Sequence, residues 1–325
     1  MNGTWGYGGS FQVITLRTRL RTILDRVWRR AKSQLVIPLG PVQALVSLRR
    51  RIRTSNNRHR RVLHARSSLA HVNSATELTA LSPEATGSAA LGEVAVIVGV
   101  GPGFGYGVAA RLSGAGFKVA LASRNAERLD PLVARLRETN PLVHAYGCDA
   151  THEASVASTF RHVVEDLGVP TLVVYSVQEG CRVKLLDAEP AAVEQIWRSN
   201  CMGAFLVAKE AGRRMVACNR GTIVLVGATS GVIGRAGYLH FALGKFGLRA
   251  LAQVAARELG PQGVHVAHLI IDAEIAESEA EERTELTMRA ADIAEVVYQL
   301  HKQPRSSWTH ELDARPFNER FWEHC

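Results

Sequence analysis

The sequence predicts a doubly wound α/β domain, in which helices cover both faces of a parallel sheet. Short apolar runs alternate with longer amphipathic stretches from residue 91 to residue 325. The runs are almost continuous in Val, Ile, Leu and Ala, which is typical of strands buried on both faces. A glycine cluster joins the first apolar run to the first amphipathic stretch. Sheets of this class bind ligands beyond the carboxyl ends of their strands.

The elements follow one another in regular alternation. The expected strands are Val94–Val98, Lys118–Ser123, Val143–Cys148, Thr171–Tyr175, Thr222–Val226 and Val264–Ile271, with a short last strand near Trp308–Leu312. The expected helices are Tyr106–Ala115, Ala126–Thr139, Glu153–Leu167, the long stretch Ala191–Cys218, Tyr238–Leu259 and Ala290–Lys302. This pattern predicts a single domain over residues 91–325.

The first ninety residues differ in charge from the rest. Residues 1–90 hold 15 Lys/Arg and 3 Asp/Glu, whereas the remainder holds 24 and 27. The segment Leu16–Arg30 is basic and amphipathic, which is typical of mitochondrial and plastid transit peptides. We therefore expect a basic leader at 1–66, a Ser/Ala/Thr-rich linker at 67–90, and a location in a mitochondrion or plastid. A membrane-surface helix, a nucleic-acid arm, a disordered tail and a cytoplasmic location are the alternatives.

Composition argues against several classes of protein. No apolar run is long enough to span a bilayer, so stable membrane insertion is not expected. The five cysteines and the histidines show no metal-ligand spacing, and the cysteines show no pairing pattern, so we expect no metal site and a reducing compartment. The basic leader lacks interleaved aromatic residues and the remainder is mildly acidic, so nucleic acid is not an expected partner.

The glycine cluster predicts a phosphate-binding turn of a Rossmann-type domain. It places a strand, a glycine turn and a helix in that order, and the candidate cofactor residues are Gly99, Gly101, Gly103, Phe104 and Gly105. Small residues let the backbone approach a pyrophosphate, and the helix N-terminus directs unpaired N–H groups at it. Glycines recur at every second position from 99 to 107, so the loop alone leaves its register open. An ordinary glycine-rich turn is the alternative.

Several landmarks between 91 and 325 together resemble the short-chain dehydrogenase/reductase family. The spacing of the glycine loop matches the cofactor loop of that family. The resemblance implies that Asp149 binds the adenine amino group, that Asn200 belongs to the catalytic tetrad, and that Lys245 holds the nicotinamide ribose as the lysine of a YxxxK motif. It also implies a small carbonyl/alcohol substrate and a homo-oligomer formed through the helices that carry Asn200 and Lys245.

The second strand ends in Ser123 and Arg124, where an NAD enzyme would more often place an acid. A cation at this position suits the 2′-phosphate of NADP. NADP is therefore the favoured cofactor, with NAD as the alternative. A solvated charge at a helix start is the other interpretation of Arg124.

The family's tyrosine and serine are missing. Phe241 stands four residues before Lys245, and the serine position falls on Ala228. The Asn-Ala-Gly that normally follows the fourth strand is replaced by Ser176-Val177-Gln178. The tail Ser307–Asp313 and the run from Ala255 to His268 resemble a divergent branch of the family, here with Phe in place of the YxxxK tyrosine. Lys245 itself is expected on a buried helix, because Leu243, Phe246 and Leu248 surround it in the sequence.

Phenylalanine has no O–H to give to an alkoxide, so another proton donor is needed. Tyr238 lies one helical turn before Phe241 on a similar face, and Ser230 adjoins the missing serine; we include both among the candidate catalytic residues, beside Asn200 and Lys245. A packing role is the alternative for Tyr238, and His240 is expected to be a surface or interface residue. The sequence thus predicts an NADP-linked oxidoreductase with an incomplete tetrad, or, as the alternative, an inactive dinucleotide-binding or scaffold protein.

Overall fold

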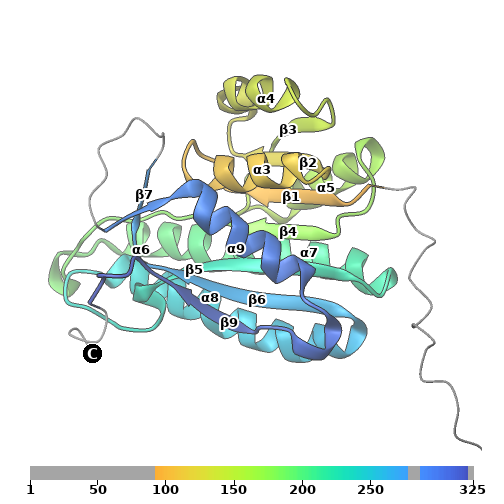
Figure 1. Cartoon of the computed structure of the whole chain (residues 1–325). Helices are drawn as coiled ribbons and strands as arrows, with labels where there is room; N and C mark the ends of the chain where they lie inside the picture. The colour runs from red at the N-terminus through yellow and green to blue at the C-terminus, as the bar shows by residue number, and fades with distance from the viewer. Residues whose placement is uncertain (1–91, 277–285, 321–325) are drawn as a thin grey trace, which may run out of the picture. The chain divides into compact units, whose positions relative to one another are not determined.

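Seven parallel strands form the sheet at the centre of the protein (Figure 1). The computed structural model describes residues 92–276 and 286–320; the predicted leader (1–66) and linker (67–90) lie outside these ranges. The order across the sheet is β3-β2-β1-β4-β5-β6-β9. The strands are β1 (Val94–Val98), β2 (Lys118–Ser123), β3 (Val143–Gly147), β4 (Leu172–Tyr175), β5 (Gly221–Ala228), β6 (Val264–Ile271) and β9 (Glu311–Ala314). The doubly wound parallel sheet is confirmed.

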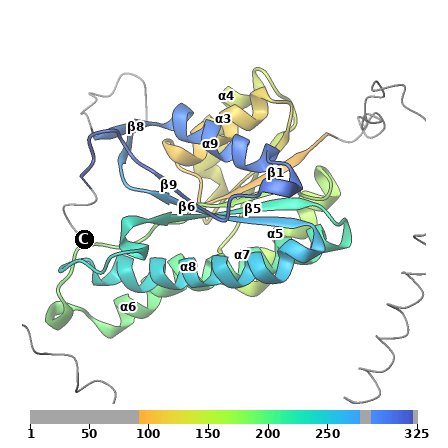
Figure 2. The same cartoon turned by 60° about the horizontal axis from the view of Figure 1, so that its bottom comes forward.

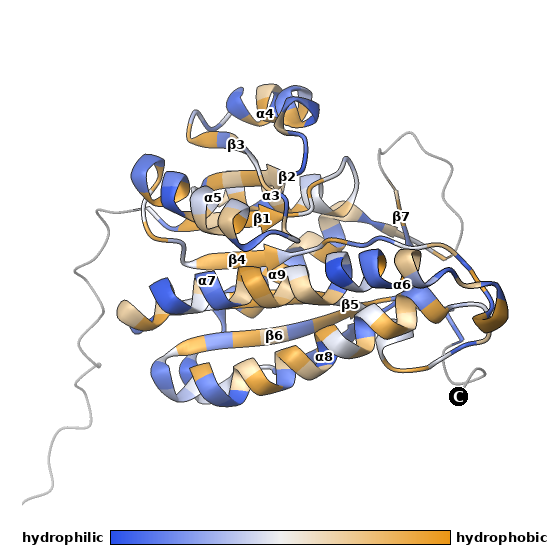
Figure 3. Ribbon diagram, turned by 180° about the vertical axis from the view of Figure 1, so that it is seen from behind, coloured by the Kyte–Doolittle hydropathy of each residue, from blue (hydrophilic) through white to orange (hydrophobic). Residues whose placement is uncertain are grey.

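Helices cover both faces of this sheet, as Figure 2 shows. One face carries α3 (Phe104–Gly114), α4 (Asp130–Arg137) and α9 (Ala290–Lys302). The other carries α5 (Glu153–Asp166), α7 (Gly203–Ala217) and α8 (Leu239–Leu259), with α6 (Pro190–Trp197) leading into α7. In Figure 3 the strands are mostly apolar, whereas several helices show both apolar and polar residues. Burial of the strands on both sides explains their continuous apolar runs.

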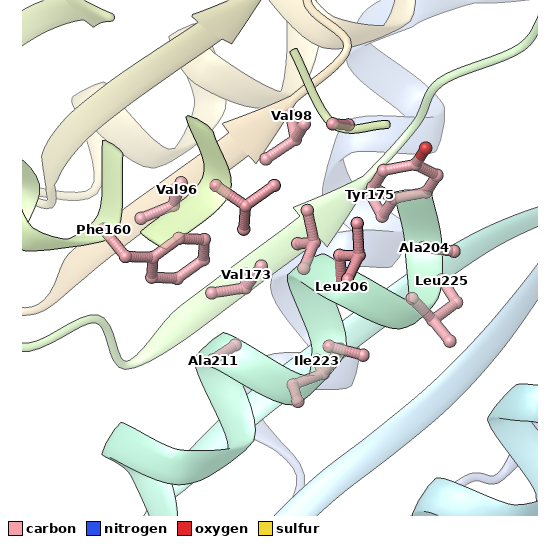
Figure 4. Close-up of a cluster of buried hydrophobic side chains, with 14 of the residues drawn as sticks. Val96, Val98, Phe160, Val173, Tyr175, Ala204, Leu206, Ala211, Ile223 and Leu225 are labelled. Carbon is pink, nitrogen blue, oxygen red and sulfur yellow. The ribbon is translucent and has the colours of Figure 1, made fainter. Parts of the chain in front are cut away.

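The alternation of side chains along each strand divides the core into two clusters. In β1, Val96 and Val98 face α5 and α7, whereas Ala95 and Ile97 face α3 and α9. Figure 4 shows the first cluster, in which Phe160 of α5 packs beside the valines of β1 and β4. These two cores fix the strands, and thereby the edge at which their carboxyl ends meet.

The structure differs from the sequence-based expectation in several places. The helix expected at Ala126–Thr139 begins as a 3₁₀ turn, Ala126–Leu129, before α4, and the strand expected near Trp308–Leu312 is β9, Glu311–Ala314. The long helix expected at Ala191–Cys218 is interrupted by a π-helical turn, Arg198–Met202, between α6 and α7. Two three-residue strands that periodicity did not indicate, β7 (Glu274–Ala276) and β8 (Thr287–Arg289), pair in parallel after β6. Three residues are too few to show a period of two.

The strand order switches between β1 and β4, because later strands are added on the other side of β1. The first three strands run outward from β1, and the chain then crosses back to place β4 on the other side of β1. Loops at such a switch point diverge and leave a crevice beyond the carboxyl ends of the strands. The glycine loop follows β1 and the Ser176 segment follows β4, so both border this crevice. Among the described residues, no helix has the combined length and apolar character needed to cross a membrane.

Candidate active site at the carboxyl edge of the sheet

Two of the glycines after β1 have a steric reason. Gly99 has a positive φ of +93°, and a Cβ there would lie 2.7 Å from the backbone nitrogen of Val177. A Cβ on Gly105 would lie 2.8 Å from the Cα of Val100. At Gly101, in contrast, a Cβ would meet no protein atom within 4 Å, and this residue borders the crevice. The loop therefore packs tightly against the protein and leaves open space on its outer side.

Helix α3 begins directly after this loop. The Tyr106 amide donates to the Gly101 carbonyl at 3.0 Å. Among the described residues, no bond from the Phe104 or Gly105 amide to the loop occurs. Gly103 is the N-cap, no side chain caps the helix, and its first turn holds no acidic residue. An uncapped N-terminus attracts a negatively charged group through its unpaired N–H donors and the helix dipole. The loop and the helix start fit the pyrophosphate of a dinucleotide, since backbone donors and open space coincide there.

Two clefts meet at this edge of the sheet. The outer cleft, of about 660 Å³, is bordered by the glycine loop and by the residues that follow β2, β3 and β4. The inner cleft, of about 220 Å³, lies beyond the ends of β5 and β6. Ser176 and Gln178 line both clefts, so the two adjoin at these residues. The Ser176 hydroxyl bonds to the carbonyls of Val98 and Gly99, at 3.1 Å each, and so ties β4 to the glycine loop.

The far end of the outer cleft is basic. Ser123, Arg124 and Arg128 all line it. The Arg124 side chain is 70% exposed, and its Nη1 lies 3.8 Å from a carboxylate oxygen of Glu179. At this exposure the contact contributes little to stability, and the guanidinium is free to meet a ligand. No acidic side chain stands at the end of β2, where Ser123, Arg124 and Asn125 follow one another.

Asp149 follows β3 and borders the same cleft. Its Oδ1 accepts hydrogen bonds from the Thr151 amide at 2.9 Å and the Thr151 hydroxyl at 2.7 Å, and His152 lies 3.1 Å from its Oδ2. Partial burial alone would raise the pKa of Asp149, but these partners outweigh it and hold the pKa below its ordinary value. The carboxylate is therefore ionised and fixed in orientation, as an acceptor for an amino group must be.

Asn200 is completely buried in the π-helical turn. Its amide donates to the Glu179 carbonyl at 2.6 Å, and its Oδ1 accepts from the Glu179 amide at 3.1 Å. The Tyr175 hydroxyl donates to the Ser199 carbonyl within the same turn. Gly244 of α8 lets that helix pass close, because a Cβ there would lie 2.6 Å from the Cβ of Asn200. Asn200 thus positions the loop after β4, which forms one wall of the outer cleft.

Lys245 is fully buried and lines neither cleft, but it binds Val226, which lines the inner cleft, and Val177, which lines the outer cleft. Its ammonium donates to the carbonyls of Val226 at 3.0 Å and Val177 at 3.3 Å, and no carboxylate pairs with it among the described residues. Burial lowers the pKa of Lys245 to about 8. Lys245 lies on a helix, as expected, but its neighbours Leu243 and Phe246 are not buried. They are 45% and 43% exposed. The buried stripe instead runs through residues 244, 245, 248 and 252.

The inner cleft holds the positions where the family's tyrosine and serine would stand. Phe241 and Ala228 line it, and so do the two candidate substitutes, Tyr238 and Ser230. The rings of Tyr238 and Phe241 are tilted with their centroids 6.1 Å apart. Neither the Tyr238 hydroxyl nor the Ser230 hydroxyl bonds to another residue within the described ranges. Two residues with unpartnered hydroxyls therefore line the space in which a carbonyl would react.

Arg315, which follows β9, binds two residues that line the inner cleft. Its guanidinium binds the Thr229 hydroxyl at 2.9 Å, Asp272 at 2.9 Å and Asp313 at 2.7 Å. Thr229 and Asp272 both line the inner cleft. The C-terminal segment therefore fixes the loops after β5 and β6.

His240 lies near this cleft but is only 4% exposed, so the expectation of a surface or interface histidine was wrong. Its Nδ1 lies 3.5 Å from the Cys181 sulfur. The residue shares one helical stripe with Gly244 and Leu248, at i+4 and i+8, which is the signal that would have placed it inside.

Sequence reasoning missed three further residues of the site: Glu179, Arg235 and Arg315. Glu179 and Arg235 lie in loops, where side-chain periodicity gives no signal. Arg315 follows a four-residue edge strand, and nothing in the sequence ties it to Thr229 some 86 residues earlier. The described residues contain no group of His, Cys, Asp and Glu side chains arranged to hold a metal ion.

The fold and the cleft define a dinucleotide-binding α/β domain. A family model described as "short chain dehydrogenase" matches residues 93–284. A short-chain dehydrogenase/reductase of Armillaria gallica is 35% identical over 189 residues, which is 56% of this chain and 71% of that protein. D-threitol dehydrogenase of Mycolicibacterium smegmatis is 27% identical over 179 residues, 54% of this chain and 67% of that protein.

Solved structures of short-chain dehydrogenases and oxidoreductases are also similar to this chain. A short-chain dehydrogenase from Rhodopseudomonas palustris is 32% identical with a TM-score of 0.62, and the match covers 69% of this chain and 99% of that one. A metagenomic short-chain oxidoreductase in complex with NADP is 25% identical with a TM-score of 0.62, over 70% and 99%. This chain belongs to the short-chain dehydrogenase family, and the relatives it matches are oxidoreductases.

Proposed function

We propose that this chain is an NADP-dependent oxidoreductase that interconverts a small carbonyl compound and its alcohol, with Tyr238 as the proton donor. The adjoining clefts are the observation that carries the proposal, since they bring the glycine loop and the uncapped start of α3 next to a pocket lined by Ser230 and Tyr238. A bound nicotinamide would supply or accept the hydride. An assay of the full chain with NADPH and a panel of aldehydes and ketones tests the proposal, which requires turnover.

The residues of the chain divide the remaining work. The glycine loop and the start of α3 would bind the pyrophosphate, and Asp149 would accept from the adenine amino group. Lys245 would hold the nicotinamide ribose, which is the role that the family resemblance implies. Ser230 would donate to the carbonyl oxygen, and Tyr238 would give its proton to the alkoxide that forms there. General acid help of this kind contributes about 10²–10⁴ in rate.

The preference for NADP rests on Arg124 and Arg128 at the outer end of the cleft. We expect Arg124→Ala to weaken NADPH binding roughly 10- to 100-fold, because it removes charge-assisted hydrogen bonds to the 2′-phosphate. NADH binding should change by less than about threefold, since NADH lacks that phosphate. Titration calorimetry on the full chain measures both constants.

Arg161→Ala is the matched control, because Arg161 is an exposed arginine on α5 that does not line the cleft. Its ratio of NADPH to NADH affinity should equal that of the wild type. An unchanged ratio in Arg124→Ala would contradict the assignment of the 2′-phosphate site.

A second candidate function is dinucleotide binding without turnover. It is favoured by the replacement of two tetrad hydroxyls by Phe241 and Ala228. Under this alternative NADPH binds, yet no carbonyl compound in the panel is reduced. The turnover assay therefore separates the two candidates directly.

We also propose that this chain forms a homo-oligomer. An apolar groove of about 450 Å³ runs between α7 and α8, and Phe205 and Val254, which line it, are 41% and 53% exposed. Large apolar side chains at this exposure are typical of a surface that meets a partner. These are the helices through which the family resemblance implies association.

A further inference from the structure

Arg235 is the one charged residue of the inner cleft that has no partner among the described residues. It lies in the loop between the turn Thr229–Gly231 and α8, and it lines the cleft beside Ser230 and Tyr238. Its Nε and Nη2 are buried from solvent, and neither donates a hydrogen bond. A guanidinium remains charged at every relevant pH. Two buried donor nitrogens, which carry three N–H groups, are unfavourable without acceptors, so their retention calls for an explanation.

The carboxylate in the lining of the inner cleft, Asp272, does not neutralise Arg235. Its Oδ2 instead binds Arg315 at 2.9 Å. A further cation, Arg182, has its guanidinium 4.9 Å from the centre of the Tyr238 ring. Among the described residues, the inner cleft therefore carries a positive charge without a partner carboxylate, next to the two hydroxyls that we assign to the carbonyl.

From this arrangement we infer that the substrate carries an oxyanion, a carboxylate or a phosphate, which binds Arg235 while its carbonyl lies at Ser230 and Tyr238. The inference rests on the proposed function and adds the substrate class. The planar fork of a guanidinium matches both oxygens of a carboxylate or phosphate. The volume of about 220 Å³ restricts the substrate to a short chain. The cofactor's own phosphates do not meet this need, because the glycine loop that would bind them borders the outer cleft.

The test compares anionic compounds with uncharged ones of similar size. The full chain is saturated with NADPH, and 2-oxobutanoate is compared with butan-2-one, and dihydroxyacetone phosphate with dihydroxyacetone. Binding is measured by calorimetry and turnover by the loss of NADPH. We expect at least one anion to exceed its neutral counterpart by about 10- to 100-fold in affinity or in kcat/KM. The pair that shows the larger ratio identifies the oxyanion as carboxylate or phosphate.

Three variants assign the preference to Arg235. In Arg235→Met the ratio of anionic to neutral compound should fall to near one, and in Arg235→Lys it should recover in part, because the charge returns without the fork. Arg257→Met is the control, because Arg257 is exposed near the other end of α8 and lies outside the cleft. It should keep the wild-type ratio. The ligand-free Arg235→Met protein should also melt no lower than the wild type, since it loses an unpaired buried charge.

The outcomes separate this inference from the proposed function. Anion binding that depends on Arg235 but leads to no turnover would support the anion site and contradict the catalytic proposal. Turnover of neutral and anionic compounds at equal efficiency would support catalysis and overturn the anion site. Retention of the anion preference in Arg235→Met, or failure of every anion to bind the NADPH complex, would also overturn it.

Discussion

Replacing Tyr238 by Phe is expected to lower kcat by about 100-fold or more, because it removes the proton donor that we assign to the reaction. The phenol lines the inner cleft, and no described residue accepts a hydrogen bond from it. Its backbone is well anchored, since the Tyr238 amide donates to the Arg235 carbonyl at 3.1 Å and the residue bridges to Val183. The Tyr238→Phe change therefore tests the hydroxyl without moving the loop, and NADPH affinity should remain at the wild-type value.

A second substitution turns this prediction into a two-way test. Phe241 stands where the family's tyrosine would be, with its ring 6.1 Å from that of Tyr238. The double variant Tyr238→Phe/Phe241→Tyr should have a kcat at least about tenfold above that of Tyr238→Phe alone, since position 241 also lines the inner cleft. If Tyr238→Phe keeps full activity while Ser230→Ala abolishes it, the proton donor is not Tyr238.

Lys245→Met is expected to reduce kcat/KM by about 100-fold or more and, at the same time, to stabilise the protein. The wild-type ammonium is fully buried and meets two backbone carbonyls but no carboxylate among the described residues. Keeping a proton on it at pH 7 costs roughly 3 kcal/mol, because burial lowers its pKa from 10.5 to about 8. Methionine removes this cost and leaves two carbonyls without a donor, so the net gain should be about 1–2 kcal/mol.

The pH dependence of unfolding isolates this effect. Between pH 8 and pH 10.5 the unfolded chain holds the Lys245 proton while the folded protein has released it. Stability contributed by this group therefore rises as the pH increases through that window, and Lys245→Met should lack the rise. Lys184→Met, which alters an exposed lysine, should keep it. A Lys245→Met protein that is less stable than the wild type, with an unchanged pH profile, would mark Lys245 as a structural cation.

Much of the fold could be predicted because the apolar pattern of each segment matches the position of that segment in the folded sheet. Strands buried on both faces leave continuous apolar runs, and each run ends at glycine or polar residues. The helix Ala290–Lys302 and the strand Val264–Ile271 have the bounds that the pattern indicated. The π-helical turn at Arg198–Met202 gave no such signal, because one extra residue per turn barely changes the apolar spacing.

The candidate site was predictable only where backbone shape or a family motif marks it. The steric reasons for Gly99 and Gly105 follow directly from the positions of Val177 and Val100, which only the fold brings close. The free charge of Arg235 could not be anticipated, since it depends on Asp272 being bound by Arg315 across 43 residues. Pairings of this kind are set by tertiary packing and leave no trace in local spacing.

Gly101 offers the most direct test of the central claim that a dinucleotide lies along this cleft. A Cβ at this position would meet no protein atom within 4 Å, so Gly101→Val adds its side chain to the space that the cofactor would fill. Calorimetry on the full chain should show NADPH binding to the wild type and none to Gly101→Val, while both proteins melt at the same temperature. Equal NADPH binding by the variant, or the absence of binding of either NADPH or NADH to the wild type, would contradict the account.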